Sequence, residues 1–333
     1  MKKPSSAIVA VTCRCNGRCV MCNIWRNARK KELKAEDFAR LPESLSIINI
    51  TGGEPFLRED LVEIISVLND RCGGPRFVIS TNGLRPDLIE AQLKKMRWSG
   101  LRLGVRVSVD GVGQTHDAVR GVEGAFDRAM ETVDVLKRLK VRDAGIAFTI
   151  LKENAHQLKA VYDLSRRLGV QFTVSAAQNS EIYFGVNALP PASGGKIIQD
   201  QMEAVIRDQL ARFNIKDWFR AYYLFGLHRH MVGKSLAGWC GAAQDFFFMD
   251  PEGNIYICPL HDMKLGNICE SAFGDIWSSL SADKARAFAQ TCSRKCWMTC
   301  TVTPYIRRRF LRVLCWIAAN KIAVHCGKNV MRQ

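Results

Sequence analysis

The first half of the chain alternates short apolar segments with amphipathic ones, and this alternation restricts the folds it can adopt. The amphipathic segments 61–69, 88–96, 125–139 and 158–168 place apolar residues at helical spacing. The apolar segments have the length of buried strands. They are 7–12, 46–51, 76–81, 102–110, 145–151 and 171–175. This order predicts an α/β fold, with a parallel sheet that is covered by helices and is either open or closed into a barrel.

The regular alternation stops after residue 176, and the rest of the chain changes character three times. A less regular stretch comes first, a cysteine-rich block follows, and a basic, apolar segment ends the chain. We therefore expect a barrel core at 1–176, a helical connector on the substrate side at 177–237, a small cysteine-rich domain at 238–304, and a basic C-terminal tail at 305–333.

Three cysteines follow the first predicted strand in a CxxxCxxC arrangement: Cys15, Cys19 and Cys22. Ligand sets made only of thiolates favour soft metals and above all iron–sulfur clusters. A cubane cluster normally takes four cysteines, so three in one loop leave one iron open to another ligand. Cys13 falls outside this spacing and is expected to be a bystander.

Polar residues follow the next predicted strands. Residues 52–55 (Gly-Gly-Glu-Pro) come after the second strand and Asn82 after the third, while Ser108 and Asp110 end the fourth, with Arg120 shortly beyond. Two adjacent glycines let the backbone approach a ligand closely. In barrels of this type the chemistry lies at the C-terminal ends of the strands. The ordered set therefore predicts a binding site at one end of the sheet.

In these motifs, residues 7–176 resemble the radical S-adenosylmethionine (radical SAM) superfamily. The resemblance implies a partial (β/α)6 barrel of the TIM type and a [4Fe–4S] cluster held by the three cysteines, with SAM on the fourth iron. Reductive cleavage of SAM would yield a 5′-deoxyadenosyl radical that abstracts hydrogen from a C–H bond. By resemblance, Gly52, Gly53, Glu54 and Pro55 would bind the methionyl amine, Ser108 and Asp110 the ribose or carboxylate, and Arg120 the carboxylate, while Asn82 would line the pocket.

A second group of cysteines surrounds a predicted β-hairpin whose turn is 251–254. Cys240 precedes the hairpin, Cys258 ends it, and Cys292, Cys296 and Cys300 come later. Cysteines that bracket a hairpin form a good metal cage, for which structural zinc is one interpretation. The pattern also resembles the SPASM domains of radical SAM enzymes and their shorter twitch form, which implies an auxiliary [4Fe–4S] cluster.

The supply of cysteines limits this second site to one cluster. Cys240 and Cys258 would take two positions, and two of Cys292, Cys296 and Cys300 would take the others; which two remains open at this point. Cys269, Cys315 and Cys326 are expected to be thiols without a metal.

The segment 179–185 should overhang the mouth of the barrel. Tyr183 and Glu181 are its predicted catalytic residues, in hydrogen relay or proton acceptance. The alternative is a surface loop with no catalytic part.

The net charge of +16 is concentrated near the end of the chain, because residues 284–333 contain eleven Lys or Arg and no Asp or Glu. Such asymmetry indicates an anionic partner. In the tail, Phe310, Val313, Leu314 and Ile317 share a helical face, with arginines on another. A basic amphipathic helix that also contains Trp316 suits peripheral contact with an anionic membrane. The alternative is a helix docked on the barrel with solvated arginines. Nucleic acid is not expected, because no groove-reading motif is present.

The sequence thus predicts a radical SAM enzyme with one auxiliary cluster and an electron donor of the flavodoxin or ferredoxin type. The clustered cysteines indicate a reducing compartment, so we expect a cytoplasmic protein. Oxidation, C–C or C–X coupling, or epimerisation all fit the cofactors. The substrate stays open between a lipid or other anionic molecule, suggested by the tail, and a peptide of the RiPP type, suggested by resemblance. The hypothesis from another class is a non-catalytic iron–sulfur electron-transfer protein.

Overall fold

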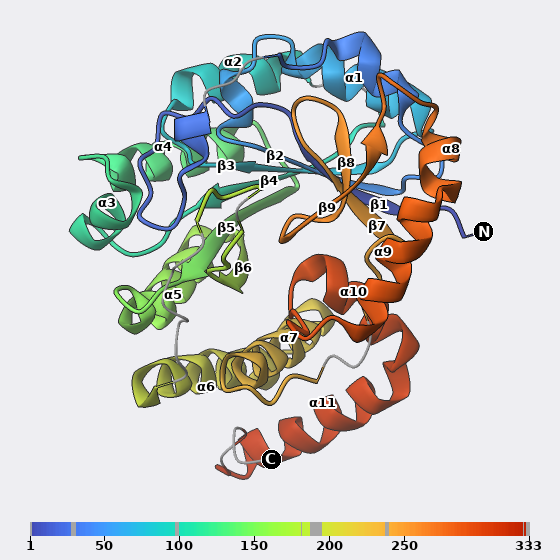
Figure 1. Cartoon of the computed structure of the whole chain (residues 1–333). Helices are drawn as coiled ribbons and strands as arrows, with labels where there is room; N and C mark the ends of the chain where they lie inside the picture. Colours follow the sequence, from blue (N-terminus) through green and yellow to red (C-terminus); the bar gives the residue numbers. More distant parts are fainter. Residues whose placement is uncertain are drawn as a thin grey trace.

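The computed structural model describes residues 2–27, 31–96, 100–180, 182–186, 195–236, 240–328 and 330. Within these segments one nine-stranded sheet forms the core, in the order β6-β5-β4-β3-β2-β1-β7-β8-β9 (Figure 1). Its strands are β1 (Ser6–Ala10), β2 (Ile47–Thr51), β3 (Arg76–Thr81), β4 (Arg102–Ser108), β5 (Asp143–Ile150), β6 (Gln171–Ala176), β7 (Phe246–Met249), β8 (Asn254–Cys258) and β9 (His261–Asn267).

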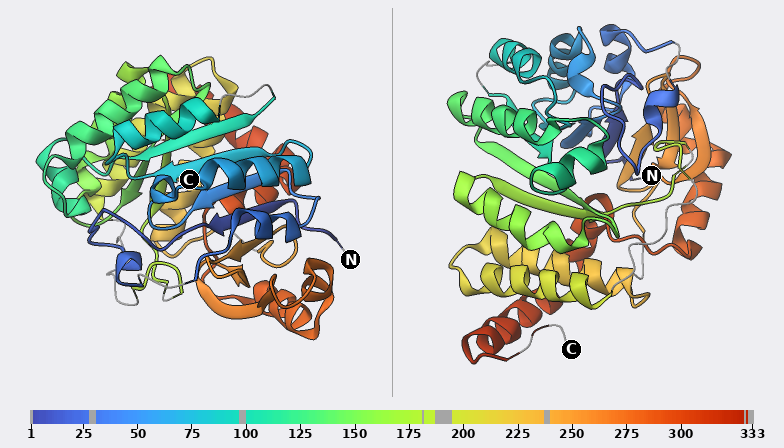
Figure 2. Two further views of the ribbon diagram at one scale, coloured as in Figure 1. Left: turned by 90° about the horizontal axis from the view of Figure 1, so that it is seen from above. Right: turned by 90° about the vertical axis from the view of Figure 1, so that its left-hand side faces the viewer.

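Helices cover the outer face of this sheet and extend beyond its β6 edge (Figures 1 and 2). Those that follow the parallel strands are α1 (Leu61–Arg71), α2 (Pro86–Lys95), α3 (Gln114–Arg120), α4 (Ala125–Arg138) and α5 (Leu158–Leu168). The later helices are α6 (Lys196–Ala211), α7 (Ile215–Met231), α8 (Phe273–Ser278), α9 (Leu280–Thr291), α10 (Thr299–Arg308) and α11 (Phe310–His325).

Strands β1 to β6 pair in parallel with their neighbours in chain order, and this confirms the predicted α/β fold. The sheet curves without closing, as a partial barrel does. Alternate residues of β1 and β2, among them Val9 and Ile50, are fully buried. Because these strands are parallel, the loops after β1 to β4 meet at one end of the sheet.

The sheet continues on the other side of β1 with strands from the cysteine-rich block. β7 pairs in parallel with β1, so that Ser6 lies opposite Phe246, and β8 and β9 follow in antiparallel fashion. All four residues of β7 are buried. The hairpin predicted around 251–254 is thus present, and it is joined directly to the barrel sheet.

Helices α6 and α7 form a layer beyond β6, and α11 packs outside them (Figure 2). α10 runs across the predicted boundary between the cysteine-rich domain at 238–304 and the tail at 305–333. Gly226 in α7 receives the indole of Trp297. A Cβ at Gly226 would lie 2.1 Å from Trp297 Cζ2. The indole is buried, and its Nε1–H donates to the carbonyl of Tyr223 at 2.8 Å, so it cannot move aside easily.

We expect Gly226→Ala to lower the free energy of unfolding by about 1–3 kcal/mol, because the added methyl overpacks the contact with Trp297. Chemical denaturation of the reconstituted protein measures this loss. Gly274→Ala in α8 is the matched control, since a Cβ at this position would meet nothing within 4 Å. That variant should be neutral or more stable by up to about 1 kcal/mol. Equal stability of the two variants would contradict the packing described here.

Candidate functional site

The cysteine loop after β1 is anchored to the C-terminal end of α3. Arg18 N–H donates to the carbonyl of Arg120 at 2.9 Å, and Val20 N–H donates to that of Val119 at 3.0 Å. Gly121 has a φ of 63°, and a Cβ there would lie 2.4 Å from the Arg18 carbonyl oxygen. Glycine is therefore required for α3 to approach the loop this closely.

Hydrogen-bond donors surround the thiols of this loop. Gly17 N–H donates to Cys15 Sγ at 3.4 Å, Asn82 Nδ2 lies 3.8 Å from the same sulfur, and Arg120 Nη1 donates to Cys19 Sγ at 3.5 Å. Burial raises the pKa of the Cys15 thiol and raises that of Cys22 to about 12. These sulfurs ionise only with a compensating cation, and iron supplies one. The three cysteines therefore fit a metal cluster.

The glycine pair after β2 lies against the cysteine loop, backbone to backbone. Gly53 N–H donates to the Thr12 carbonyl at 2.7 Å, and Glu54 N–H donates to the Arg14 carbonyl at 2.8 Å. A Cβ at Gly52 would lie 2.4 Å from Thr12 O, and one at Gly53 would lie 2.2 Å from Arg14 O. Both positions therefore exclude any side chain. Residues 55–57 continue as a short 3-10 helix whose first residue, Pro55, is buried.

The Glu54 carboxylate joins this loop to the end of β3. It accepts hydrogen bonds from Asn82 N–H at 2.7 Å, Thr81 Oγ1–H at 2.9 Å and Phe56 N–H at 3.2 Å. Glu54 is 1% exposed, and this burial raises its pKa to about 7. The Glu54 carboxylate is thus held by groups of the chain itself and bridges the loop after β2 to the end of β3.

Asp110 and Arg120 form a buried ion pair at the end of β4, with 2.5 Å between Asp110 Oδ2 and Arg120 Nη2. Asp110 Oδ1 accepts from Thr149 N–H at 2.7 Å. The Nδ1 of His116 accepts from Asp110 N–H, and burial lowers the pKa of His116 to about 3, so this ring is neutral. Arg120 Nε is buried and has no partner among the described residues. An unpaired guanidinium N–H beside the cysteines suits an anionic ligand. Ser108, half-buried, ends the same strand.

Tyr183 lies between the end of β2 and strand β7. Its hydroxyl is hydrogen-bonded to Thr51 Oγ1, and its ring centroid is 5.1 Å from that of Phe248 in β7. Burial raises the pKa of Tyr183, so the phenol keeps its proton. The neighbouring Phe184 carbonyl accepts from Asn23 N–H, next to Cys22. Tyr183 is therefore close to the cysteine loop, whereas Glu181 lies outside the described residues.

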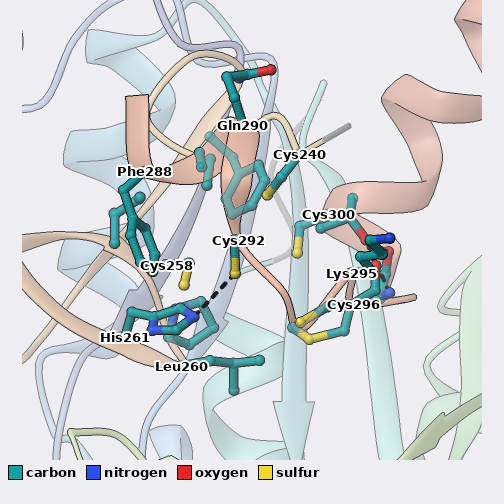
Figure 3. Close-up of a pocket in the computed structure, with 17 residues that line it drawn as sticks. Cys240, Cys258, Leu260, His261, Phe288, Gln290, Cys292, Lys295, Cys296 and Cys300 are labelled. Atoms are coloured by element: carbon teal, nitrogen blue, oxygen red, sulfur yellow. Dashed lines mark hydrogen bonds between the residues drawn. The ribbon is translucent and has the colours of Figure 1, made fainter. Parts of the chain in front are cut away.

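The second cysteine group lines a single cavity (Figure 3). Burial raises the pKa of the Cys240 and Cys300 thiols, and it raises the pKa to about 11 at Cys258 and about 12 at Cys296. Among the described residues, no three His, Cys, Asp or Glu side chains are arranged to hold a single metal ion. The cavity nevertheless brings together all the cysteines that the sequence proposed for this site. They are Cys240, Cys258, Cys292, Cys296 and Cys300.

His261 lines the same cavity and was not predicted from the sequence. Its Nε2 is 3.3 Å from Cys292 Sγ, and its ring packs edge-on against Phe288, with 4.9 Å between centroids. Its place three residues after Cys258, across the turn between β8 and β9, is the one local signal that could have identified it. Cys269, Cys315 and Cys326 are exposed and lie outside the cavity lining.

Two family models match the chain in the regions that hold these sites. The model of the radical SAM superfamily matches residues 9–165, and SPASM, an iron–sulfur cluster-binding domain, matches residues 240–301. Residues 9–165 form a radical SAM domain. The second match favours an iron–sulfur cluster over zinc in the cysteine cavity.

Curated relatives include proteins that act on different substrates. The chain is 36% identical to the Fe-coproporphyrin III synthase of Methanosarcina barkeri over 173 residues, which are 49% of this chain and 41% of that protein. It is 28% identical to the mycofactocin maturase MftC of Mycolicibacterium smegmatis over 80% of this chain and 68% of that protein. It is 25% identical to the sporulation killing factor maturation protein SkfB of Bacillus subtilis over 87% of this chain and 68% of that protein. The first match thus spans less than half of its relative.

Solved structures share the fold at lower identity. Native anSMEcpe with bound AdoMet superposes with a TM-score of 0.64 at 15% identity, covering 95% of this chain and 100% of that one. Streptococcus suis SuiB bound to S-adenosylmethionine superposes with a TM-score of 0.63 at 15% identity, covering 86% of this chain and 68% of that one. The predicted family, fold and cofactors are confirmed: this radical SAM protein carries a [4Fe–4S] cluster that binds SAM and an auxiliary iron–sulfur cluster.

We expect the pH dependence of stability to differ between the parent chain and Glu54→Gln. The folded-state pKa of Glu54 is raised from 4.5 to about 7, so the folded state binds the extra proton between these values. Stability from this group is therefore lost as the pH rises through that window. The variant lacks the group and should show a smaller decline in thermal unfolding midpoint. Glu59→Gln, at an exposed neighbouring position, should keep the parent's slope; identical slopes in all three proteins would contradict the assignment.

Proposed function

We propose that this radical SAM protein modifies a peptide by abstracting hydrogen from one of its C–H bonds. The observation that supports this is similarity to two maturases, MftC and SkfB, over 80% and 87% of the chain. The structural neighbour SuiB has also been solved with its precursor peptide SuiA. A second candidate is an anionic tetrapyrrole, favoured by a match to the AdoMet-dependent heme synthase of Methanosarcina barkeri over 81% of the chain and by the net charge of +16.

The bound cofactors would supply a 5′-deoxyadenosyl radical, and the residues of the chain would bind and orient them. In our proposal Cys15, Cys19 and Cys22 ligate the cluster, and residues 52–55 receive the methionyl amine through their backbone. Arg120 then uses its unpartnered Nε to bind the SAM carboxylate, while Asp110 holds the guanidinium in place. Ser108 would face the ribose, and Asn82 would orient Cys15 through the contact described above.

For the auxiliary cluster we propose Cys240, Cys258, Cys296 and Cys300 as ligands. Cys300 lies in the first turn of α10, where the positive end of the helix dipole favours a thiolate. Cys292 is the C-cap of α9, where the negative end of the helix dipole disfavours a thiolate. Its sulfur is also hydrogen-bonded to His261. Cys292 would then remain a thiol beside the cluster.

We expect Cys300→Ala to lose about four irons per chain and Cys292→Ala to keep them, because Cys300 is one of the four proposed ligands of the auxiliary cluster and Cys292 is not. Iron analysis after anaerobic reconstitution measures this. Cys269→Ala, at an exposed position outside the cavity, is the control and should keep all its iron. Iron loss in Cys292→Ala with retention in Cys300→Ala would reject the proposed ligand set.

Tyr183 is our proposed hydrogen-relay residue, because its protonated phenol lies next to the cysteine loop and to residues 52–55, the glycine loop. Glu181 remains a proposal from the sequence alone. The auxiliary cluster would accept or relay an electron, so that the net reaction is an oxidation, a C–C or C–X coupling, or an epimerisation. We further propose a cytoplasmic location and an electron donor of the flavodoxin or ferredoxin type, since the clusters require a low-potential reductant and a reducing compartment.

Anaerobic incubation with dithionite, SAM and deuterium-labelled peptides tests the function. We expect 5′-deoxyadenosine that carries deuterium from a peptide encoded beside the gene. Tyr183→Phe, which removes one O–H, should still form 5′-deoxyadenosine but lose at least about tenfold in modified peptide. Tyr162→Phe, in which the lost hydroxyl bonds Asp208 on α6, is the control and should behave as the parent.

Three outcomes would count against these proposals. Absence of 5′-deoxyadenosine in the reduced, reconstituted protein would favour the electron-transfer hypothesis. Deuterium transfer from coproporphyrin but not from peptide would favour the tetrapyrrole candidate. Equal loss of modified peptide in both tyrosine variants would remove Tyr183 from the relay.

A further inference from the structure

Helix α11 exposes apolar side chains on the side that faces away from the rest of the molecule. Val313 and Ile317 are buried against the layer of α6 and α7, whereas Leu311 is 77% exposed and Ile322 is 66% exposed. Leu311, Leu314 and Ile322 follow one another at helical spacing along the outward face. This corrects the face expected from the sequence, which grouped Val313 and Ile317 with Leu314.

The indole of Trp316 also points inward. Its ring centroid lies 4.8 Å from that of Phe225 and 5.2 Å from that of Tyr222, both in α7. One face of α11 thus packs on the rest of the protein, and its other face is exposed. Soluble helices normally turn polar residues to water, so an apolar outward stripe calls for a covering partner.

The turn between α6 and α7 adds to this apolar surface. Phe213 is 93% exposed and Ile215 is 64% exposed. The turn lies beside α11, because Lys321 Nζ donates to the carbonyl of Leu210 at 2.6 Å and is 5.3 Å from the centre of the Phe213 ring. Figures 1 and 2 show α11 as the outermost layer of the molecule at this end.

Basic residues accompany the apolar stripe. Arg307, Arg309 and Arg312 are exposed at the start of α11 and just before it. The region from residue 284 onward contains no acidic residue that could neutralise them within the same segment. A surface that combines large apolar side chains with clustered positive charge is complementary to the interface of an anionic bilayer.

We propose that the docking face, formed by Leu311, Leu314, Ile322, Phe213 and Ile215 with the arginines beside them, lies in the plane of an anionic lipid bilayer. No helix in the described segments is long and apolar enough to cross a membrane, so the contact is peripheral. The inference does not depend on the proposed peptide substrate.

Flotation of the full-length reconstituted protein with vesicles tests the proposal. We expect binding to phosphatidylcholine vesicles that contain phosphatidylglycerol and weak binding to pure phosphatidylcholine. Leu311→Ser combined with Ile322→Ser should lower the partition coefficient at least about tenfold, because two inserted side chains are lost. Arg309→Gln combined with Arg312→Gln should lower it roughly twentyfold on the anionic vesicles alone.

Two controls match these variants in exposure. Leu280→Ser in α9 removes a side chain that is 70% exposed outside the docking face, and Arg102→Gln combined with Arg142→Gln removes two exposed charges on the barrel. Both should bind vesicles as the parent does. Circular dichroism and iron content should be unchanged in all variants, since every altered side chain is exposed.

Three results would overturn the proposal. The first is equal flotation of the docking-face variants and the controls. The second is concentration-dependent dimerisation that the Leu311 and Ile322 substitutions abolish in the absence of lipid, which would assign the face to a second copy of the chain. The third is binding to free glycerol phosphate that competes fully with vesicles, which would make the surface an anion site without insertion.

Discussion

Two backbone hydrogen bonds hold the loop after β2 against the cysteine loop after β1, and the radical SAM site is built on this contact. They run from Gly53 N–H to Thr12 O and from Glu54 N–H to Arg14 O. A side chain at Gly52 or Gly53 would occupy the space of the opposing backbone. The Glu54 carboxylate extends the contact to the end of β3. Arg120 bonds Cys19 in the cysteine loop and links that loop to β4 through Asp110. One continuous set of polar contacts thus connects four strand ends around the three cysteines.

The auxiliary site is attached to the same sheet. β7 pairs with β1, the strand that leads into the cysteine loop, and β8 ends at Cys258 in the auxiliary cavity. Phe248 of β7 packs on Tyr183, which contacts Thr51 at the end of β2. On the far side, Trp297 fills the space left by Gly226 and so joins α7 to the segment that carries Cys296 and Cys300. The two cluster sites are therefore attached to the same sheet.

Features set by local spacing could be predicted from the sequence. This holds for the βα alternation, the CxxxCxxC loop and the glycine pair, which depend on neighbours in the chain. The five cysteines of the second site were grouped through their resemblance to the SPASM pattern. Other features depend on contacts between distant residues, which a single sequence does not reveal. The pairing of β7 with β1 joins residues separated by about two hundred and forty positions. The bond between His261 and Cys292, and the choice of which face of α11 is buried, likewise follow from packing.

The central claim is that the cysteine loop and the glycine loop together place the methionyl group of SAM on the open iron. Pulsed electron paramagnetic resonance of the reduced protein with SAM labelled with 15N in its amino group tests this most directly. A Cys258→Ala variant removes the auxiliary signal from the spectrum. We predict a hyperfine coupling between the cluster and the labelled nitrogen. A reduced cluster that binds SAM without such a coupling would contradict the account.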